Sequence, residues 1–157
     1  MSSSAQRFQE VLARSGIAAK VLELPQSTRT AREAAVALDC DMAQIAKSLI
    51  FRRLDTDEPV LVVASGPNRV DEEIISAFVG APIAMADGSF VRCSTGYAIG
   101  GVPPLGHNTP LETVIDQDLL NFEFIWAAAG TPRSVFSITP QQLVKVTQGR
   151  VLRVTAP

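Results

Sequence analysis

The sequence predicts an α+β fold: a curved, mostly antiparallel mixed sheet, partly closed like a barrel, with helices packed on its outside. Three observations lead to this fold class. The 157 residues are 46% hydrophobic and 19% charged, which is enough apolar material for one packed core. Helical and strand patterns alternate without an internal repeat or a linker, which predicts a single domain over residues 1–157. Strand segments outnumber helices, and short turns join several neighbouring strands.

Local signals predict the elements at the start of the chain. Phe8, Val11, Leu12 and Ser15 follow helical spacing, and Gly16 lies where that helix would end. Three elements follow: a strand over residues 19–24, a helix over 28–39 with Thr30 and Glu33 spaced as a capping box, and a helical turn over 41–46 that Asp41 caps.

The middle of the chain predicts two strands and two helices. Residues 47–54 and 60–65 are strands, and the second is apolar on both faces, which indicates a central buried strand. A helix over 70–80 places Ile74, Ala77 and Phe78 on one face. A further short helix begins at the cap Asp87 and closes at Gly96.

Strands dominate the last third. The expected strands are 111–116, 122–129, 133–138 and 151–156. A helix over 141–149 precedes the last strand, because Thr139 and Pro140 form a cap followed by proline at the first helical position.

Composition narrows the class of function. No apolar run approaches the roughly 20 residues that a membrane span requires. The N-terminus lacks a signal-peptide pattern, which predicts a cytoplasmic protein. A net charge of −2 argues against a protein that grips nucleic acid through many phosphate contacts, although Arg52, Arg53 and Arg69 could form a local basic patch.

Metal ligands are sparse in the sequence. There is one histidine, and the two cysteines have no metal-ligand spacing, so we expect no metal and no cofactor. Cys40 and Cys93 are predicted to be buried free thiols.

The segment STGYAIGGVPPLGH contains four glycines, two adjacent prolines and the only histidine. Gly100 and Gly101 would let a ligand approach the backbone, and Pro103 and Pro104 would stiffen the loop. The N–H groups of Gly100, Gly101 and Val102 could point one way, toward an oxyanion or a phosphate. The alternative, favoured from the loop alone, is a rigid turn between a helix and a strand.

Two side chains are the other candidates for chemistry. Lys47 opens a strand on the face of Leu49 and Phe51, where a lysine is costly unless it meets an anion. It could equally pack its stem and extend its amine to water, which is the better interpretation on this evidence alone. His107 could be a base, a ligand contact or, slightly favoured, a turn residue.

The residues before the last hairpin also allow two interpretations. Trp126 is most simply a core residue. The small residues 127–130 could line a tight pocket, or they could pack closely against a helix, which is at least as good an interpretation.

Three motifs together resemble the YbaK/ProX family, the free-standing relatives of the editing domain inserted in bacterial prolyl-tRNA synthetases. They are QIAKSLIF, ADGSFVRCSTGYAIGGVPPLGH, and AAAG before TPQQL. The resemblance covers the chain from about Ala18 to its end, and TGYAIGGVPPLGH is its most specific part.

The resemblance implies a curved mixed sheet surrounded by helices and hydrolysis of wrongly charged aminoacyl-tRNA, typically tRNA for proline. The implied partners are therefore the 3′ end of a misacylated tRNA and a prolyl-tRNA synthetase. Lys47 matches the family's essential lysine, and Gly100 and Gly101 match glycines whose backbone lines the pocket. The implied substrate-binding residues are Thr30, Val102, Pro103, His107, Ala128 and Gly130.

Some relatives differ at two of these positions. They carry other residues at His107, and a polar or histidine side chain at Ala128. Two other classes of function stay open: a non-catalytic module that binds a charged tRNA end or an aminoacyl-adenosine-like ligand, and a hydrolase of unrelated small esters. The sequence specifies neither the amino acid removed nor the oligomeric state.

Overall fold

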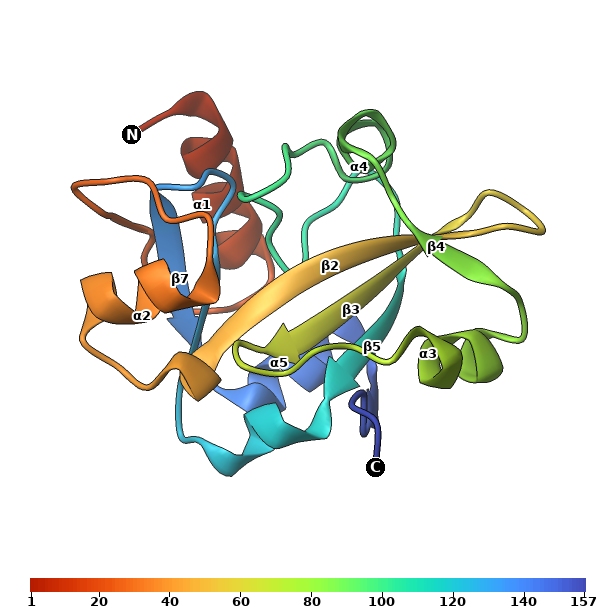
Figure 1. Cartoon of the computed structure of the whole chain (residues 1–157). Coiled ribbons are helices and arrows are strands. Elements are labelled where there is room, and N and C mark those ends of the chain that lie inside the picture. Colours follow the sequence, from red (N-terminus) through yellow and green to blue (C-terminus); the bar gives the residue numbers. More distant parts are fainter.

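The computed structural model describes residues 1–157 and contains one eight-stranded sheet (Figure 1). The strand order is β1-β7-β6-β2-β3-β5-β8, with β4 paired to β2 beside this path. The strands are β1 (Leu22–Glu23), β2 (Ile45–Arg53), β3 (Pro59–Ser65), β4 (Ile83–Met85), β5 (Glu112–Asp116), β6 (Ile125–Ala128), β7 (Ser134–Ile138) and β8 (Arg150–Leu152).

Five α-helices and two short 3₁₀ helices connect the strands. They are α1 (Ser3–Arg14), α2 (Ala31–Leu38), α3 (Glu72–Val79), α4 (Gly88–Thr95), α5 (Pro140–Thr147), η1 (Met42–Gln44) and η2 (Gln117–Asn121). The predicted caps are confirmed: Thr30 and Glu33 form a capping box on α2, Asp41 caps η1, and Asp87 caps α4. No helix is both long and apolar enough to cross a membrane.

The predicted mixed α+β class is confirmed. Four strand pairs are antiparallel, namely β1–β7, β2–β3, β2–β4 and β6–β7. The pairs β2–β6, β3–β5 and β5–β8 are parallel. The sheet does not close into a barrel, because β1 and β8 lie at its two ends and do not pair with each other.

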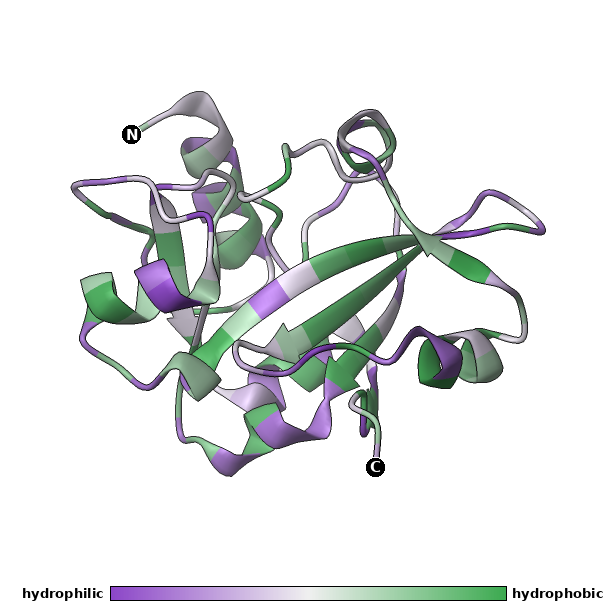
Figure 2. Cartoon of the chain, in the orientation of Figure 1, coloured by the Kyte–Doolittle hydropathy of each residue, from purple (hydrophilic) through white to green (hydrophobic).

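Strand β3 lies between β2 and β5 and is buried on both faces. Leu61 and Val63 belong to the larger apolar cluster, which α1 and α5 cover. Val60 and Val62 point to the opposite face, where α3 packs. This alternation is the period-2 pattern of a strand between two layers. Figure 2 shows β2 and β3 as largely hydrophobic ribbons, with one hydrophilic segment within β2.

One side of β2 has an opening between two partner strands. Ile45 and Ala46 pair with β6, and residues from Phe51 to Arg53 pair with β4. Residues 47–50 therefore have β3 on one side and no strand on the other. A pocket lined by residues 45–49 of β2, by α2 and by loops opens there.

Several predicted details are wrong. The strand expected over residues 19–24 shrinks to β1, a two-residue exposed strand that pairs only with β7. Strand β4 had no clear sequence signal, because its three residues are half-buried or exposed and lack alternation. Cys93 is exposed on α4 rather than buried, and Cys40 is half-buried.

The buried face of α3 also differs from the prediction. Its buried residues are Ile75 and Val79, whereas Ala77 is exposed. Asp71 fixes the start of this helix, because its N–H donates to the carbonyl of Val154 at 2.7 Å. From that start, residues 75 and 79 lie one turn apart on the face that meets the sheet.

Candidate functional site

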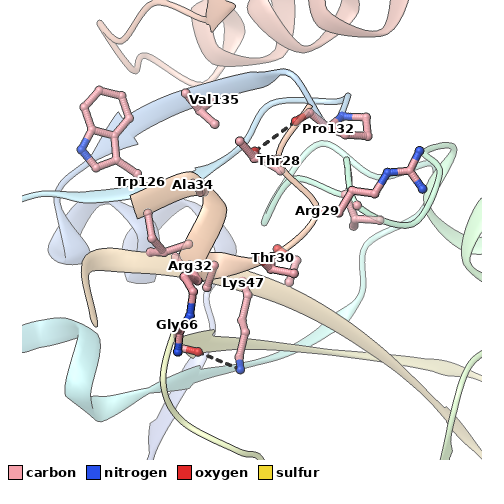
Figure 3. A pocket seen from close by; sticks show the side chains of 18 of the residues that line it. Thr28, Arg29, Thr30, Arg32, Ala34, Lys47, Gly66, Trp126, Pro132 and Val135 are labelled. Atoms are coloured by element: carbon pink, nitrogen blue, oxygen red, sulfur yellow. Dashed lines mark hydrogen bonds between the residues drawn. The ribbon is translucent and has the colours of Figure 1, made fainter. Parts of the chain in front are cut away.

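The pocket at the opening beside β2 has a volume of about 540 Å³. Its walls come from α2 and the segment before it, from β2 and β6, and from two loops around residues 99–102 and 131–132. The segment before α2 is hydrogen-bonded to the loop at residue 132. Both the N–H and the hydroxyl of Thr28 donate to the carbonyl of Pro132, at 2.7 and 3.1 Å (Figure 3). Volumes of this size are typical of small-molecule sites.

Lys47 projects from β2 into this pocket. Its Nζ donates to the carbonyl of Gly66 at 3.1 Å, and Figure 3 shows this pair on the side of the pocket opposite Trp126 and Val135. Burial lowers the pKa of Lys47 below its ordinary value, while the charge of Asp116 opposes that change. The half-buried amine therefore has one fixed hydrogen bond and donors left for a ligand.

The carbonyl that holds Lys47 belongs to a tight turn. The N–H of Asn68 donates to the carbonyl of Ser65 at 2.9 Å, which places Gly66 and Pro67 at the two central positions. A Cβ at Gly66 would collide with the carbonyl oxygen of Met42. Glycine is therefore required here for close approach between the turn and η1.

Asp116 holds the same turn through hydrogen bonds, and the sequence did not predict a role for this residue. It is 1% exposed, and its carboxylate accepts hydrogen bonds from the N–H of Ser65 at 3.0 Å and from Nδ2 of Asn68 at 2.8 Å. The parallel register pairs Ile115 with Val63, which brings the end of β5 beside the end of β3. The sequence hinted at this role only by an acidic residue at the end of an apolar strand segment.

The glycine loop, residues 96–106, lies on another wall of the pocket, and its adjacent glycines Gly100 and Gly101 differ. Gly100 lines the pocket, is exposed and has a φ of +91°. Its N–H group and that of Val102 donate to no atom of the protein. Gly101 is buried, its N–H donates to the carbonyl of Ala98 at 3.0 Å, and its carbonyl accepts from the N–H of Gly130 at 3.0 Å.

This arrangement corrects the expectation that three adjacent N–H groups point the same way. The N–H of Gly101 closes the loop's own turn, and the carbonyl of Gly101 joins the loop to residue 130. A Cβ on Gly101 would lie 2.7 Å from Cα of Thr131, so this glycine allows two backbone segments to pack together. Of the three expected donors, the N–H groups of Gly100 and Val102 therefore remain without a partner in the protein.

Not all the expected substrate-binding residues line the pocket. Thr30, Val102 and Ala128 do, whereas Pro103 and Gly130 do not. A Cβ at Gly130 would lie 2.8 Å from the carbonyl oxygen of Ser4, which shows that this glycine packs against α1. The run 127–130 thus serves both purposes that its sequence allowed, because its first two residues line the pocket.

His107 lies outside the pocket. Its Nε2 donates to the carbonyl of Pro103 at 2.7 Å, and it lines a separate hollow of about 230 Å³. Burial lowers the pKa of His107, and the bond to Pro103 opposes this effect only in part. The arrangement is that of a turn residue that braces its own loop.

Trp126 differs from its prediction as a core residue. It is half-buried and lines the pocket together with Ala127, Ala128 and Val135. These side chains form a mostly apolar wall that could contact a small side chain of a ligand.

The charge of the pocket is one-sided. Its charged lining residues are Arg29, Arg32 and Lys47, and no aspartate, glutamate, histidine or cysteine lines it. The two arginines were not singled out from the sequence. A concave site that holds cations without carboxylates favours an anionic ligand, although the whole chain has a net charge of −2. Across the molecule, no three His, Cys, Asp or Glu side chains gather in a group that could hold a metal ion.

Comparisons with known proteins agree with this geometry. The chain superposes on a candidate trans-editing enzyme for prolyl-tRNA synthetase with a TM-score of 0.94 and 45% identity, over 100% of this chain and 99% of that one. The hypothetical protein APE2540 gives a TM-score of 0.87 at 28% identity, over 94% and 98% of the two chains. YwhH of Bacillus subtilis (strain 168), an uncharacterized protein, is 31% identical over 131 residues, 83% of each chain.

The sequence model of the aminoacyl-tRNA editing domain matches residues 25–146, which include Lys47, the glycine loop and the whole pocket lining. The resemblance of the motifs to the YbaK/ProX family is thereby confirmed, and this chain belongs to the aminoacyl-tRNA editing domain family.

Proposed function

We propose that this chain is a trans-editing deacylase that hydrolyses the ester of a misacylated tRNA, a tRNA for proline that carries a wrong small amino acid. The observation that carries the proposal is the position of Lys47. Its half-buried amine reaches a pocket whose lining contains no carboxylate that would neutralise it. The family and the candidate trans-editing enzyme that shares this fold support the same reaction.

The pocket supplies the groups that ester hydrolysis requires. The charge of Lys47 binds the terminal phosphate or the ester carbonyl of the substrate. The N–H groups of Gly100 and Val102, which have no partner in the protein, stabilise the oxyanion. The wall of Trp126 and Ala128 receives a small side chain. No metal or other cofactor takes part in this scheme.

Binding of the tRNA is concentrated on its charged 3′ end. Arg29 and Arg32 lie at the same pocket as Lys47, so the phosphates near the ester meet positive charge. The chain as a whole is acidic, and a prolyl-tRNA synthetase could present the rest of the tRNA. This substrate places the reaction in the cytoplasm, with translation.

Water must still be activated, and the pocket offers no side-chain base. Its lining contains no histidine, aspartate, glutamate or cysteine, and His107 is held by its own loop. The remaining polar group next to the ester is the neighbouring hydroxyl of the terminal ribose. The proposal therefore includes substrate assistance, in which that hydroxyl positions the attacking water.

The expected result with a modified substrate follows from this step. A tRNA that ends in 2′-deoxyadenosine, charged on the 3′ oxygen, should bind normally but hydrolyse about 10²-fold more slowly, or slower still, the size typical of lost acid–base assistance. Single-turnover rates and a binding isotherm would be measured with the same preparation. Equal rates for the deoxy and normal substrates would instead assign water activation to a protein group or to an unassisted water.

The function itself is tested with a panel of charged tRNAs. tRNA for proline carrying alanine, cysteine, serine or proline is incubated with catalytic amounts of the protein, and release of free amino acid is measured. We expect at least one of the wrong amino acids to be released faster than proline. Tight binding without release would favour the non-catalytic binding module, and turnover of simple aminoacyl esters without tRNA would favour a general esterase.

A further inference from the structure

The hydrogen bonds around Lys47 lead to a second residue, Asp116, which does not line the pocket. The Nζ of Lys47 donates to one protein atom, the carbonyl oxygen of Gly66 at 3.1 Å. The direction of the amine therefore depends on the turn from Ser65 to Asn68 that presents this carbonyl. A lysine side chain has a flexible four-carbon stem, so the amine would adopt other positions if the Gly66 carbonyl were displaced.

Asp116 holds both ends of that turn. Its Oδ2 accepts the N–H of Ser65 at 3.0 Å and Nδ2 of Asn68 at 2.8 Å, and its Oδ1 accepts the N–H of Asp118 at 3.0 Å. Asn68 is shared, because Nδ2 also donates to Oδ2 of Asp118 at 2.8 Å. The Gly66 carbonyl thus belongs to a turn whose first and last residues both donate hydrogen bonds to one buried carboxylate.

Burial makes this carboxylate unusual. A carboxylate that is 1% exposed is costly unless it is paired and hydrogen-bonded, and Asp116 has three hydrogen bonds but no salt bridge. Lys47 is close enough to feel its charge, since Asp116 opposes the lowering of the pKa of Lys47 by burial. The other charged groups around Lys47 are Arg29 and Arg32 in the pocket and Asp118 on η2.

We propose that Asp116 is a positioning residue for Lys47: it fixes the Gly66 carbonyl through Ser65 and Asn68, and it supplies the buried counter-charge of the amine. The role in catalysis rests on the proposed deacylase function. The link between Asp116 and Lys47 is a property of the folded chain and can be measured without any substrate.

The experiment compares Asp116→Asn with Asp71→Asn as a matched control. Asp71 also accepts the N–H two residues further on, at 3.0 Å, but it is the N-cap of α3 and does not line the pocket. The chain contains three lysines, of which Lys20 and Lys145 are exposed, so NMR can distinguish the side-chain signals of the half-buried Lys47 from the other two, and Lys47 is then titrated.

In Asp116→Asn we expect the pKa of Lys47 to fall below its value in the native chain, because the charge that opposes the effect of burial is gone. The single-turnover rate should fall about 10- to 100-fold, as expected for a misplaced reacting group, and its loss at alkaline pH should begin at lower pH. Asp71→Asn should change neither the Lys47 titration nor the rate.

Asn68→Ala separates position from charge and provides a second variant should Asp116→Asn fold poorly. It removes one clamp of the turn but keeps the buried carboxylate. We expect a slower reaction with a nearly unchanged titration of Lys47.

Each contrary result has a distinct meaning. An unchanged Lys47 titration and an unchanged rate in Asp116→Asn would overturn the proposal. A shifted titration with an unchanged rate would overturn the catalytic part of the role. If the native chain hydrolyses no charged tRNA, the deacylase function fails, and the titration alone decides whether Asp116 acts on Lys47.

Discussion

Replacement of Lys47 by alanine is expected to reduce the single-turnover rate of deacylation by about 10²- to 10³-fold or more, the size seen when one preorganised oxyanion donor is lost. Arg29 and Arg32 remain in this variant, but no cation is left at the Gly66 turn. The rate would be measured on a tRNA for proline charged with the amino acid that the native protein removes fastest.

Two controls separate catalysis from folding. Lys20→Ala removes an exposed lysine outside the pocket and should leave the rate unchanged. Thermal unfolding of Lys47→Ala should show little change in stability, because relief of the cost of a half-buried amine offsets the loss of the positive charge near Asp116. Unchanged turnover would remove Lys47 from the mechanism, and a large drop in the melting temperature would favour a structural role.

Gly101→Val is expected to have the second largest effect and to impair activity more than His107→Ala. Gly101 does not have a positive φ, so its requirement is one of space. A Cβ would lie 2.7 Å from Cα and 2.8 Å from N of Thr131, and both are backbone atoms that cannot rotate away. The loop must therefore separate from residues 130–131, and the bond from the N–H of Gly130 to the carbonyl of Gly101 is lost.

The expected rate loss for Gly101→Val is about 10²-fold, because displacement of a catalytic loop by about 1 Å has effects of this size. A fall in stability of about 1–3 kcal/mol from overpacking should accompany it. In His107→Ala, one bond to the Pro103 carbonyl is removed outside the pocket, and the rate should change little. The reverse order of the two variants would make His107 a catalytic residue and reduce the glycine loop to a connection.

Local sequence signals predicted much of the fold. Helix α2 follows from its capping box of Thr30 and Glu33, and β3 from an apolar run too short for a helix. Features that depend on tertiary contacts were not predicted. Strand β4 exists because three residues meet the end of β2, and nothing in their own pattern shows it. The exposure of Cys93 and of part of Trp126 likewise depends on which neighbours cover them.

In the candidate site, too, residues with local sequence signals were predicted, and contacts that depend on the tertiary structure were not. Lys47, Gly100 and Ala128 come from motif segments, and the structure brings them to one pocket although 81 positions separate the first from the last. Asp116 was missed because its contact with Ser65 spans 51 residues and depends on the parallel register of β3 and β5. The Gly101 amide was assigned the wrong direction because its partner, the Ala98 carbonyl, is fixed only once the turn has formed.

The most direct test of deacylase function is the number of amino acids released per protein chain. Charged tRNA for proline is supplied in large excess over the protein, and free amino acid is followed over time against spontaneous ester hydrolysis. We expect many turnovers per chain for a tRNA carrying a wrong small amino acid, few for prolyl-tRNA, and none above background with Lys47→Ala. Release that stops at or below one equivalent, or a rate that Lys47→Ala does not change, would contradict the account.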